Sequence, residues 1–370
     1  MAGGFRGMYD PDVIRRMVAD GDTENKVTAL EEKQAKLKEV AKREYVAQDG
    51  VTYKTFGELF NWKPTLVPEE LPVAVFTDED WPEEARCMIP DPNENWIWPR
   101  EATEKFAAAL STNDTTLLFG LQGTGKSDLA KQWAATFRYP CWRMNCNAET
   151  REAHFTGNMG IIYDDDGNPH IRQEPTALTD SLRYGGIFIE DEAFRHSSAL
   201  VLQSLREKSS RFLLLPNAVG MSADERKLVA PVARWHYVMT DNTVGLGDET
   251  GTFQAEVQDV STLDRIDTVI EMDYLGKVEE RKILNKYAPS LNEDQVNSML
   301  DFAKAVRMAF KKDELMSTFS VRALLNWADK ISMYGSMDTA LKVCWFDKLS
   351  NNDKAIVKEI YMQVFATAIK

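Results

Sequence analysis

Residues 120–127 are Gly120-Leu121-Gln122-Gly123-Thr124-Gly125-Lys126-Ser127, which match the pattern G-x-x-x-x-G-K-[ST] without a mismatch. An apolar run, residues 115–119, comes directly before this octapeptide, and a helical pattern, residues 127–137, comes directly after it. In that context the pattern forms a phosphate-binding loop, because glycines let backbone N–H groups curl around an anion and the helix directs its positive end at the same anion. We therefore predict a strand, a P-loop and a helix in succession.

The side chains of this loop have distinct expected roles. Lys126 supplies a cation for the β- and γ-phosphates of a nucleotide, and the Ser127 hydroxyl can ligate Mg²⁺. The cofactors predicted from the loop are thus ATP and Mg²⁺. The residues expected to bind the nucleotide are Gly120, Gln122, Gly123, Thr124, Gly125, Lys126, Ser127 and Asp128.

A second cluster of polar residues follows the apolar run 186–189, which ends in Glu190, Asp191 and Glu192. At a strand end beside the loop, one carboxylate can hold Mg²⁺ and a second can polarise the attacking water. We assign the metal to Asp191, together with Ser127, and the water to Glu192. Side chains alternate along a strand, so Glu190 should point away from Asp191.

The chain around these motifs alternates between strands and helices. Further apolar runs of strand length occupy residues 141–144, 237–240 and 268–272. This alternation is typical of βαβ units and predicts a parallel sheet covered on both faces. After residue 275 the pattern becomes wholly helical, with helices expected at residues 278–287, 292–310, 320–334 and 353–368. The expected fold class is α/β, with a parallel P-loop core and a C-terminal all-α domain.

The N-terminal part of the chain has a different composition. Residues 11–48 are highly charged with helix-like apolar spacing, which favours a surface helix over a coiled coil. Residues 49–100 are rich in proline and tryptophan and predict an extended segment held by aromatic anchors instead of a compact sheet. We predict three regions: a partly helical N-terminal extension over 1–95, an α/β core over 96–275 and a helical domain over 276–370.

Charge and composition exclude several classes of protein. The 370 residues carry a net charge of −14, which argues against a protein that wraps nucleic acid. The four cysteines are scattered and fit no usual zinc pattern. No apolar run approaches the ~20 residues that a membrane span needs. The expected location is therefore the cytoplasm.

Residues 96–335 resemble the MoxR branch of AAA+ ATPases, and in particular the CobS-type ATPase subunit of cobalt chelatase. One shared segment is Thr240-Asp241-Asn242-Thr243-Val244-Gly245-Leu246-Gly247-Asp248-Glu249-Thr250-Gly251, which is similar to the family's N-T-x-G-x-G-D-x-T-G. The other is Leu263-Asp264-Arg265, which is similar to the family's L-D-R or M-D-R element.

The resemblance implies further site residues and a ring, expected to be a hexamer, in which neighbouring subunits complete each other's sites. Asn242 is implied as the polar sensor beside Asp191; the alternative is an ordinary turn residue. Arg265 is implied as the arginine finger that reaches the neighbour's γ-phosphate; the alternative is a surface ion pair with Asp264 or Asp267. Arg322 is implied as the sensor arginine of the lid, although a single arginine early in a helix is common.

Two insertions interrupt the α/β core. Residues 155–180 predict a β-hairpin with an Asp-Gly turn, which the resemblance places at the centre of the ring, and residues 212–232 form a second insertion. The resemblance implies a protein client and a partner with a von Willebrand A domain (CobT-like). The function expected is an ATP-driven motor that remodels a client. The alternatives are a subunit of a cobalt or magnesium chelatase and, disfavoured by the acidic composition, a nucleic-acid motor.

Overall fold

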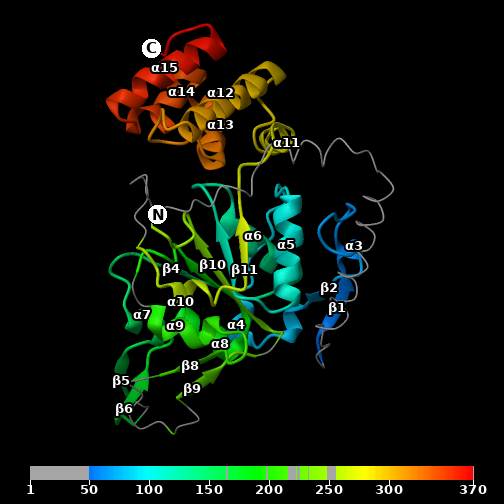
Figure 1. Ribbon diagram of the computed structural model, residues 1–370, viewed down its shortest axis with the longest axis vertical. Coiled ribbons are helices and arrows are strands. Elements are labelled where there is room, and N and C mark those ends of the chain that lie inside the picture. The colour runs from blue at the N-terminus through cyan, green and yellow to red at the C-terminus, as the bar shows by residue number, and fades with distance from the viewer. Residues whose placement is uncertain are drawn as a thin grey trace, which may run out of the picture.

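The computed structural model describes residues 50–163, 166–196, 199–215, 222, 226–231, 233–247 and 256–369 (Figure 1). The helix predicted within residues 11–48 lies outside these ranges. So do residues 164–165 in the hairpin turn, part of the second insertion and residues 248–251 of the segment shared with the MoxR branch.

The centre of the molecule is a five-stranded parallel sheet in the order β11-β3-β10-β7-β4. Every residue of β7 and β10 is buried, so helices and loops cover the sheet on both faces, as predicted. All five strands coincide with predicted apolar runs, which confirms the parallel core. Their bounds are β3 (Thr116–Phe119), β4 (Cys141–Asn145), β7 (Gly186–Asp191), β10 (Trp235–Asp241) and β11 (Thr268–Glu271).

The helix after the phosphate loop, α6 (Lys126–Phe137), packs across β3, β10 and β7. It begins after Gly125, which has a left-handed backbone (φ 90°), and ends at Arg138, which is also left-handed (φ 58°). The other helices of the α/β region are α5 (Arg100–Ser111), α7 (Glu152–Thr156), α8 (Ala177–Tyr184), α9 (Ala199–Arg206) and α10 (Val260–Leu263).

The proline- and tryptophan-rich segment contains a small sheet, so the prediction that it forms no sheet is wrong. Strands β1 (Thr52–Thr55) and β2 (Pro72–Val75) pair antiparallel, because their β-branched residues favour a pleated, half-buried surface. The aromatic anchors are confirmed: the Phe60 ring lies 5.4 Å from that of Trp98 and 6.0 Å from that of Trp133. The short helices here are α3 (Phe56–Leu59), the 3-10 helix η1 (Asp78–Asp80) and α4 (Glu83–Arg86).

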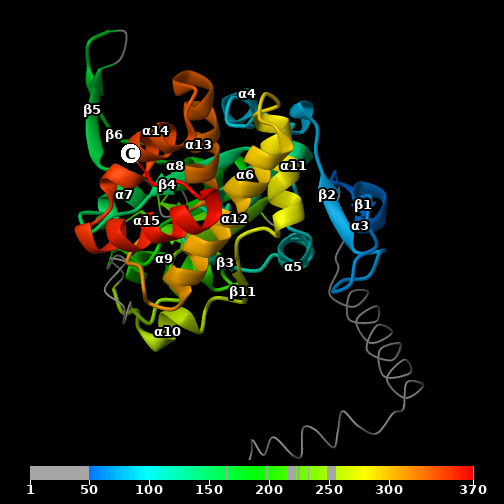
Figure 2. The same cartoon turned by 90° about the horizontal axis from the view of Figure 1, so that it is seen from above.

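Two hydrophobic cores divide the described chain. The first extends from Phe56 to Met272, so the segment before residue 95 packs as part of the α/β core. The second extends from Leu284 to Ile369 and lies wholly within the helical C-terminal region. Figures 1 and 2 show that region above the carboxyl ends of the sheet strands.

The helical region contains the four predicted helices and a short helix that the sequence pattern does not predict, α14 (Met337–Cys344). The eight residues of α14 are too few for a clear apolar period. Among the described residues, no helix combines the length and apolarity needed to cross a bilayer. The remaining elements are α11 (Lys277–Tyr287), α12 (Glu293–Lys311), α13 (Val321–Tyr334), the 3-10 helix η2 (Phe346–Lys348) and α15 (Asn351–Phe365).

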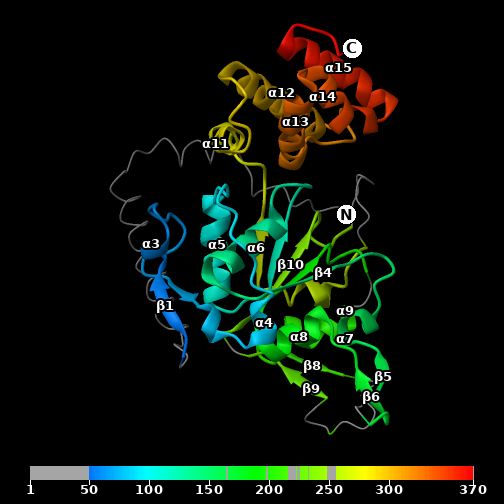
Figure 3. The ribbon, with the colours of Figure 1, turned by 180° about the vertical axis from the view of Figure 1, so that it is seen from behind.

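Two antiparallel hairpins project from the end of the core opposite the helical region (Figures 1 and 3). Strands β5 (Met159–Tyr163) and β6 (Pro169–Gln173) form the predicted first hairpin. Strands β8 (Phe212–Leu214) and β9 (Lys227–Val229) form a hairpin within the second insertion.

The buried imidazole of His236 on β10 makes the fold sensitive to acid. Burial, aided by the nearby Arg211 charge, lowers the pKa of His236 from 6.5 to about 3, and neither ring nitrogen has a hydrogen-bond partner among the described residues. The unfolded chain therefore binds more protons than the folded chain between these two pKa values. Stability is full above pH 6.5 and falls as the pH drops toward 3, by about 1.4 kcal/mol per pH unit.

We expect the His236→Phe variant to lose less thermal stability than the wild-type chain between pH 7.5 and pH 5.5. The measurement is Tm at both pH values. The control is His154→Gln, since His154 is exposed. An equal fall in Tm for the wild-type and His236→Phe chains would contradict the assignment.

Candidate active site

The predicted site residues meet at the carboxyl edge of the sheet. Strand β10 lies between β3 and β7, and its register pairs Asp241 with Phe119 on one side and Thr240 with Asp191 on the other. Because these strands are parallel, the segments that follow them leave from the same edge. The phosphate loop, the acidic residues 190–192 and Asn242 are thus brought together.

The loop backbone follows a path that only glycine allows at two positions. A Cβ atom on Gly120 would lie 2.1 Å from the Met272 carbonyl oxygen, and Gly120 has φ of 144°. A Cβ atom on Gly123 (φ 73°) would lie 2.5 Å from Cβ of Ser320, the residue that caps α13. The loop therefore packs between the end of β11 and the helical region.

Lys126 lies at the centre of the loop. Its Nζ donates to the carbonyl oxygens of Gly120 and Leu121, at 2.7 and 2.9 Å, and to Oδ1 of Asn242 at 3.0 Å. Burial lowers the pKa of Lys126 to about 8, opposed by the charges of Asp241, Asp191 and Glu192. The ammonium group remains largely protonated at neutral pH and is available to an anion.

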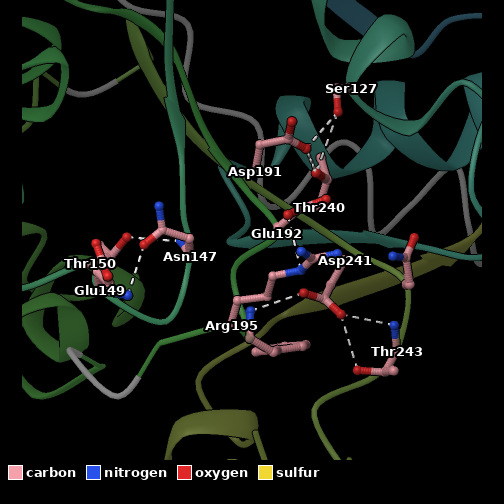
Figure 4. A network of polar contacts seen from close by, with 12 residues as sticks. Ser127, Asn147, Glu149, Thr150, Asp191, Glu192, Arg195, Thr240, Asp241 and Thr243 are labelled. Carbon is pink, nitrogen blue, oxygen red and sulfur yellow. Dashed lines mark hydrogen bonds and ion pairs between the residues drawn. The ribbon is translucent and has the colours of Figure 1, made fainter. Parts of the chain in front are cut away.

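Ser127, Asp191 and Thr240 form a cluster of oxygen atoms from three segments (Figure 4). The Ser127 hydroxyl donates to Asp191 Oδ1 at 2.7 Å, and the hydroxyl of Thr240 donates to the same oxygen. Burial alone would raise the pKa of Asp191, but hydrogen bonds from Thr240, Ser127 and Arg143 lower it. An ionised carboxylate beside hydroxyl groups is the hard-oxygen set that suits Mg²⁺, so Ser127 and Asp191 fit the predicted metal.

Glu192 follows Asp191 in a left-handed conformation (φ 58°), and its carboxylate is partly exposed. Arg195 holds it in an ion pair of 3.0 Å, visible in Figure 4. Asp241 fixes the same turn, since its carboxylate accepts from the Phe194 N–H at 3.0 Å and from the Thr243 N–H at 2.9 Å. The two predicted carboxylates therefore have separate surroundings suited to separate roles.

The other predicted residues of the loop lie around Lys126. Thr124 is buried and donates to the Leu121 carbonyl at 2.9 Å, whereas Asp128 is exposed in the first turn of α6. The Gln122 carbonyl accepts from the Tyr274 hydroxyl at 2.9 Å, a contact with the segment that leads to the helical region.

The two remaining predicted arginines lie away from this cluster. Arg265 precedes β11, donates to the Ser261 carbonyl at 2.5 Å, and forms no ion pair with another described residue, including Asp264 and Asp267. Arg322 is exposed in the first turn of α13, two residues after Ser320, the cap residue that contacts the phosphate loop.

Sequence reasoning missed two residues that act on Asp191. Arg143 forms an ion pair with Asp191, and the Thr240 hydroxyl binds it from the middle strand. A signal existed for Arg143, because it is the only charged residue in the strand Cys141–Asn145. Thr240 directly precedes Asp241 and Asn242, and only its register opposite Asp191 shows its role.

Glu190 belongs to a different network, as the alternation along β7 predicted. Its buried carboxylate accepts from Arg206 at 3.1 Å, from the Tyr237 hydroxyl at 2.5 Å, and contacts the His196 ring at 2.8 Å. Although burial would raise the pKa of Glu190, Arg206 and the hydrogen bonds keep it lowered. This network joins β7, the start of the segment after Glu192, and α9.

Comparison with known proteins covers both the core and the helical region. Residues 115–257 match the family described as AAA domain (dynein-related subfamily), and residues 280–367 match the family described as CbbQ/NirQ/NorQ C-terminal. The aerobic cobaltochelatase subunit CobS of Sinorhizobium sp is 28% identical over 298 residues, with 77% of this chain and 85% of that protein covered.

Two solved structures of RuvB from Thermotoga maritima are also similar, at a lower level. The Holliday junction branch migration motor is 15% identical, with 75% of this chain and 72% of that chain covered and a TM-score of 0.42. A mutant of RuvB is 13% identical, with 76% and 81% covered and a TM-score of 0.46.

The close approach of Gly123 to Ser320 can be tested by substitution. We expect Gly123→Ala to weaken nucleotide binding about tenfold or more, since the added methyl group collides with Ser320 and displaces the loop. Ser320→Gly should restore much of the affinity in the double variant, because glycine is a tolerable helix cap.

The matched control is Gly167→Ala. Gly167 has a similar φ of 82° but open space around it, so this variant carries the backbone strain without the collision. The measurement is nucleotide affinity by calorimetry. Equal affinity in the Gly123→Ala and Gly167→Ala chains would show that the collision has no effect.

Proposed function

The chain is an AAA+ P-loop ATPase of the MoxR and CobS type, and from this premise we propose that it is an ATP-hydrolysing ring motor that remodels a protein client. The observation that carries the proposal is the convergence of Lys126, Ser127, Asp191 and Asn242 at one edge of the sheet. A cation, a metal-binding pair and a polar sensor within hydrogen-bond reach of one another are the parts that phosphoryl transfer requires.

Lys126 and the loop backbone bind the phosphates. The Lys126 ammonium is held by three neutral oxygen atoms, so charged phosphate oxygens compete for it effectively. Ser127 and Asp191 would hold Mg²⁺, which when bound supplies positive charge next to the β- and γ-phosphates. Asn242 contacts Lys126 through Oδ1, and its amide N–H₂ has no hydrogen-bond partner among the described residues, so it can orient a phosphate oxygen or the attacking water.

Glu192 is the residue that we assign to the attacking water. Its carboxylate is partly exposed and lies next to Asp191 in sequence, so it can accept the proton of a water near the phosphates. The ion pair with Arg195 restrains the Glu192 carboxylate.

Arg265 is positioned to act on a neighbouring subunit instead of on its own loop. It precedes the first residue of β11, Thr268, which pairs with Thr116 at the amino end of β3, whereas the phosphate loop follows Phe119 at the carboxyl end. The four residues of β3 place its amino end and the start of the phosphate loop about 13 Å apart. A guanidinium at the amino edge therefore supports a site completed across a subunit interface, as in a ring.

The two hairpins offer a surface for a protein client. On β5–β6, Ile161 and Tyr163 are 65% and 69% exposed, and on β8–β9, Leu214 and Val229 are 56% and 54% exposed. Apolar side chains that gather on projecting hairpins are typical of protein contact sites. We propose that the hairpins contact the client and that a von Willebrand A domain protein assists, as the resemblance implies.

A subunit of a metal chelatase is the second candidate. The 28% identity to an aerobic cobaltochelatase subunit, which covers 85% of that protein, favours it. In that case the client is the partner subunit of the chelatase, and the ATPase cycle proposed here is unchanged.

We expect Lys126→Ala to abolish nucleotide binding, because the central cation of the site is lost. Glu192→Gln should retain ATP but hydrolyse it at least about 10²-fold more slowly, since the glutamine cannot accept a proton. ATP affinity and turnover are measured for each variant. Lys131→Ala, on the exposed face of the same helix, is the control. A wild-type rate in Glu192→Gln would remove Glu192 from its assigned role.

The arginine finger is tested by mixing two inactive variants. Arg265→Ala should lower the hydrolysis rate by about 10³-fold or more with little change in ATP affinity. Mixtures of Arg265→Ala and Glu192→Gln chains should recover part of the activity, because one interface then combines an intact Glu192 with an intact Arg265. Arg281→Ala on α11 is the control. Full activity of a dilute monomer, or no recovery in any mixture, would contradict a shared site.

A further inference from the structure

A groove of about 620 Å³ lies at the base of the β5–β6 hairpin, and none of the residues assigned to ATP lines it. Trp142, the second residue of β4, and Tyr184, which directly precedes the turn into β7, belong to its wall. Trp142 is therefore near the beginning of β4, and Tyr184, the last residue of α8, lies just before the beginning of β7. The groove is therefore at the amino edge of the sheet, the edge opposite the phosphate loop.

The wall of the groove contains two aromatic rings, of which Trp142 is buried and Tyr184 is half-buried. The rings of Trp142 and Tyr184 stack, with centroids 6.2 Å apart and an interplanar angle of 21°. The indole N–H of Trp142 donates to the Gly185 carbonyl at 2.8 Å, so the indole has no donor left for a ligand. Met88 and the exposed Ile161 add apolar surface.

The polar groups of the groove are acceptors. Gln173 is 5% exposed; its amide N–H₂ donates to the Thr156 carbonyl, which fixes the orientation of the amide and leaves Oε1 buried without a hydrogen-bond partner among the described residues. Such an atom is costly unless a donor reaches it. Glu84 and Glu174 bring two exposed carboxylates that form no ion pair with any other described residue.

Among the described side chains that line the groove, one is basic, and it is already paired. Arg183 lies 3.5 Å from the Asp180 carboxylate, so their charges offset each other. The remaining formal charge of the described lining residues is that of Glu84 and Glu174, which is negative. A complementary ligand carries a positive charge, several N–H donors and a flat surface that stacks on aromatic rings.

We propose that the groove binds an arginine-bearing segment of a partner protein. A guanidinium has five N–H donors in one plane and stacks on aromatic faces, which a lysine ammonium does less well. In the groove it would lie against the half-buried ring of Tyr184 and neutralise the exposed carboxylates of Glu84 and Glu174. The exposed Ile161 on the adjoining hairpin accommodates an apolar neighbour of that arginine, which favours a peptide over a free amino acid.

The inference goes beyond the motor function proposed above and does not depend on it. Binding to the groove is measured without nucleotide, so an unsuccessful peptide experiment leaves the ATPase assignment intact, and the reverse also holds.

The test uses the full chain and two fluorescein-labelled peptides, Gly-Ser-Leu-Arg-Leu-Ser-Gly and the same peptide with citrulline in place of arginine. Citrulline retains the shape of arginine and loses its charge. Fluorescence anisotropy should show that the arginine peptide binds about tenfold more tightly. The double variant Glu84→Gln and Glu174→Gln should lose this preference. Both positions are exposed, so folding should be preserved, and ATPase activity checks it.

Glu83→Gln provides the matched control, because Glu83 is an exposed neighbour of Glu84 on α4 that does not line the groove. Equal affinity for the two peptides, no binding of either, or the same loss in Glu83→Gln would overturn the proposal. An unlabelled peptide of residues 33–43, which is rich in lysine, is added as a competitor. Displacement by this peptide at lower concentrations than by the arginine peptide would assign the groove to the chain's own N-terminal region and overturn the assignment to a partner.

Discussion

The hydrogen bond from Ser127 to Asp191 joins residues that follow β3 and end β7, although β10 lies between these strands. The contact forms because parallel strands end at one edge, where the side chain at the end of the middle strand, Thr240, binds the same carboxylate. The positions of Lys126, Asn242 and Glu192 all follow from this alignment. A shift of β10 by one residue would turn Thr240 to the other face and remove the cluster.

Charge around this edge is balanced within the protein. Lys126 lies among Asp191, Asp241 and Glu192, while Arg143 and Arg195 pair with two of these three carboxylates. Each ionised group therefore has a partner of opposite charge in a partly buried setting, where electrostatic interactions are stronger than in water. This arrangement holds the side chains in place with little reorganisation, which is the condition for electrostatic stabilisation of phosphoryl transfer.

The two ends of the sheet carry different kinds of surface. The carboxyl edge faces the helical region through Gly123 and Tyr274, and the amino edge bears both hairpins and the aromatic groove. Strand β4 contributes a side chain to each: Trp142 lines the groove, and Arg143 forms an ion pair with Asp191. The Glu190 network adds a buried link from β7 to α9, the helix that precedes the second hairpin.

Local pattern determined the strands, the phosphate loop, most helices of the C-terminal region and the acidic turn, since apolar period, glycine spacing and strand ends are all encoded by near neighbours. Only the tertiary structure decided that β1 and β2 pair, that residues 56–85 share the α/β core, and that Arg143 and Thr240 act on Asp191. The aromatic groove also arises from helices and strands far apart in the chain. These features depend on contacts between segments that are far apart in the chain, and the spacing of residues within one segment does not predict such contacts.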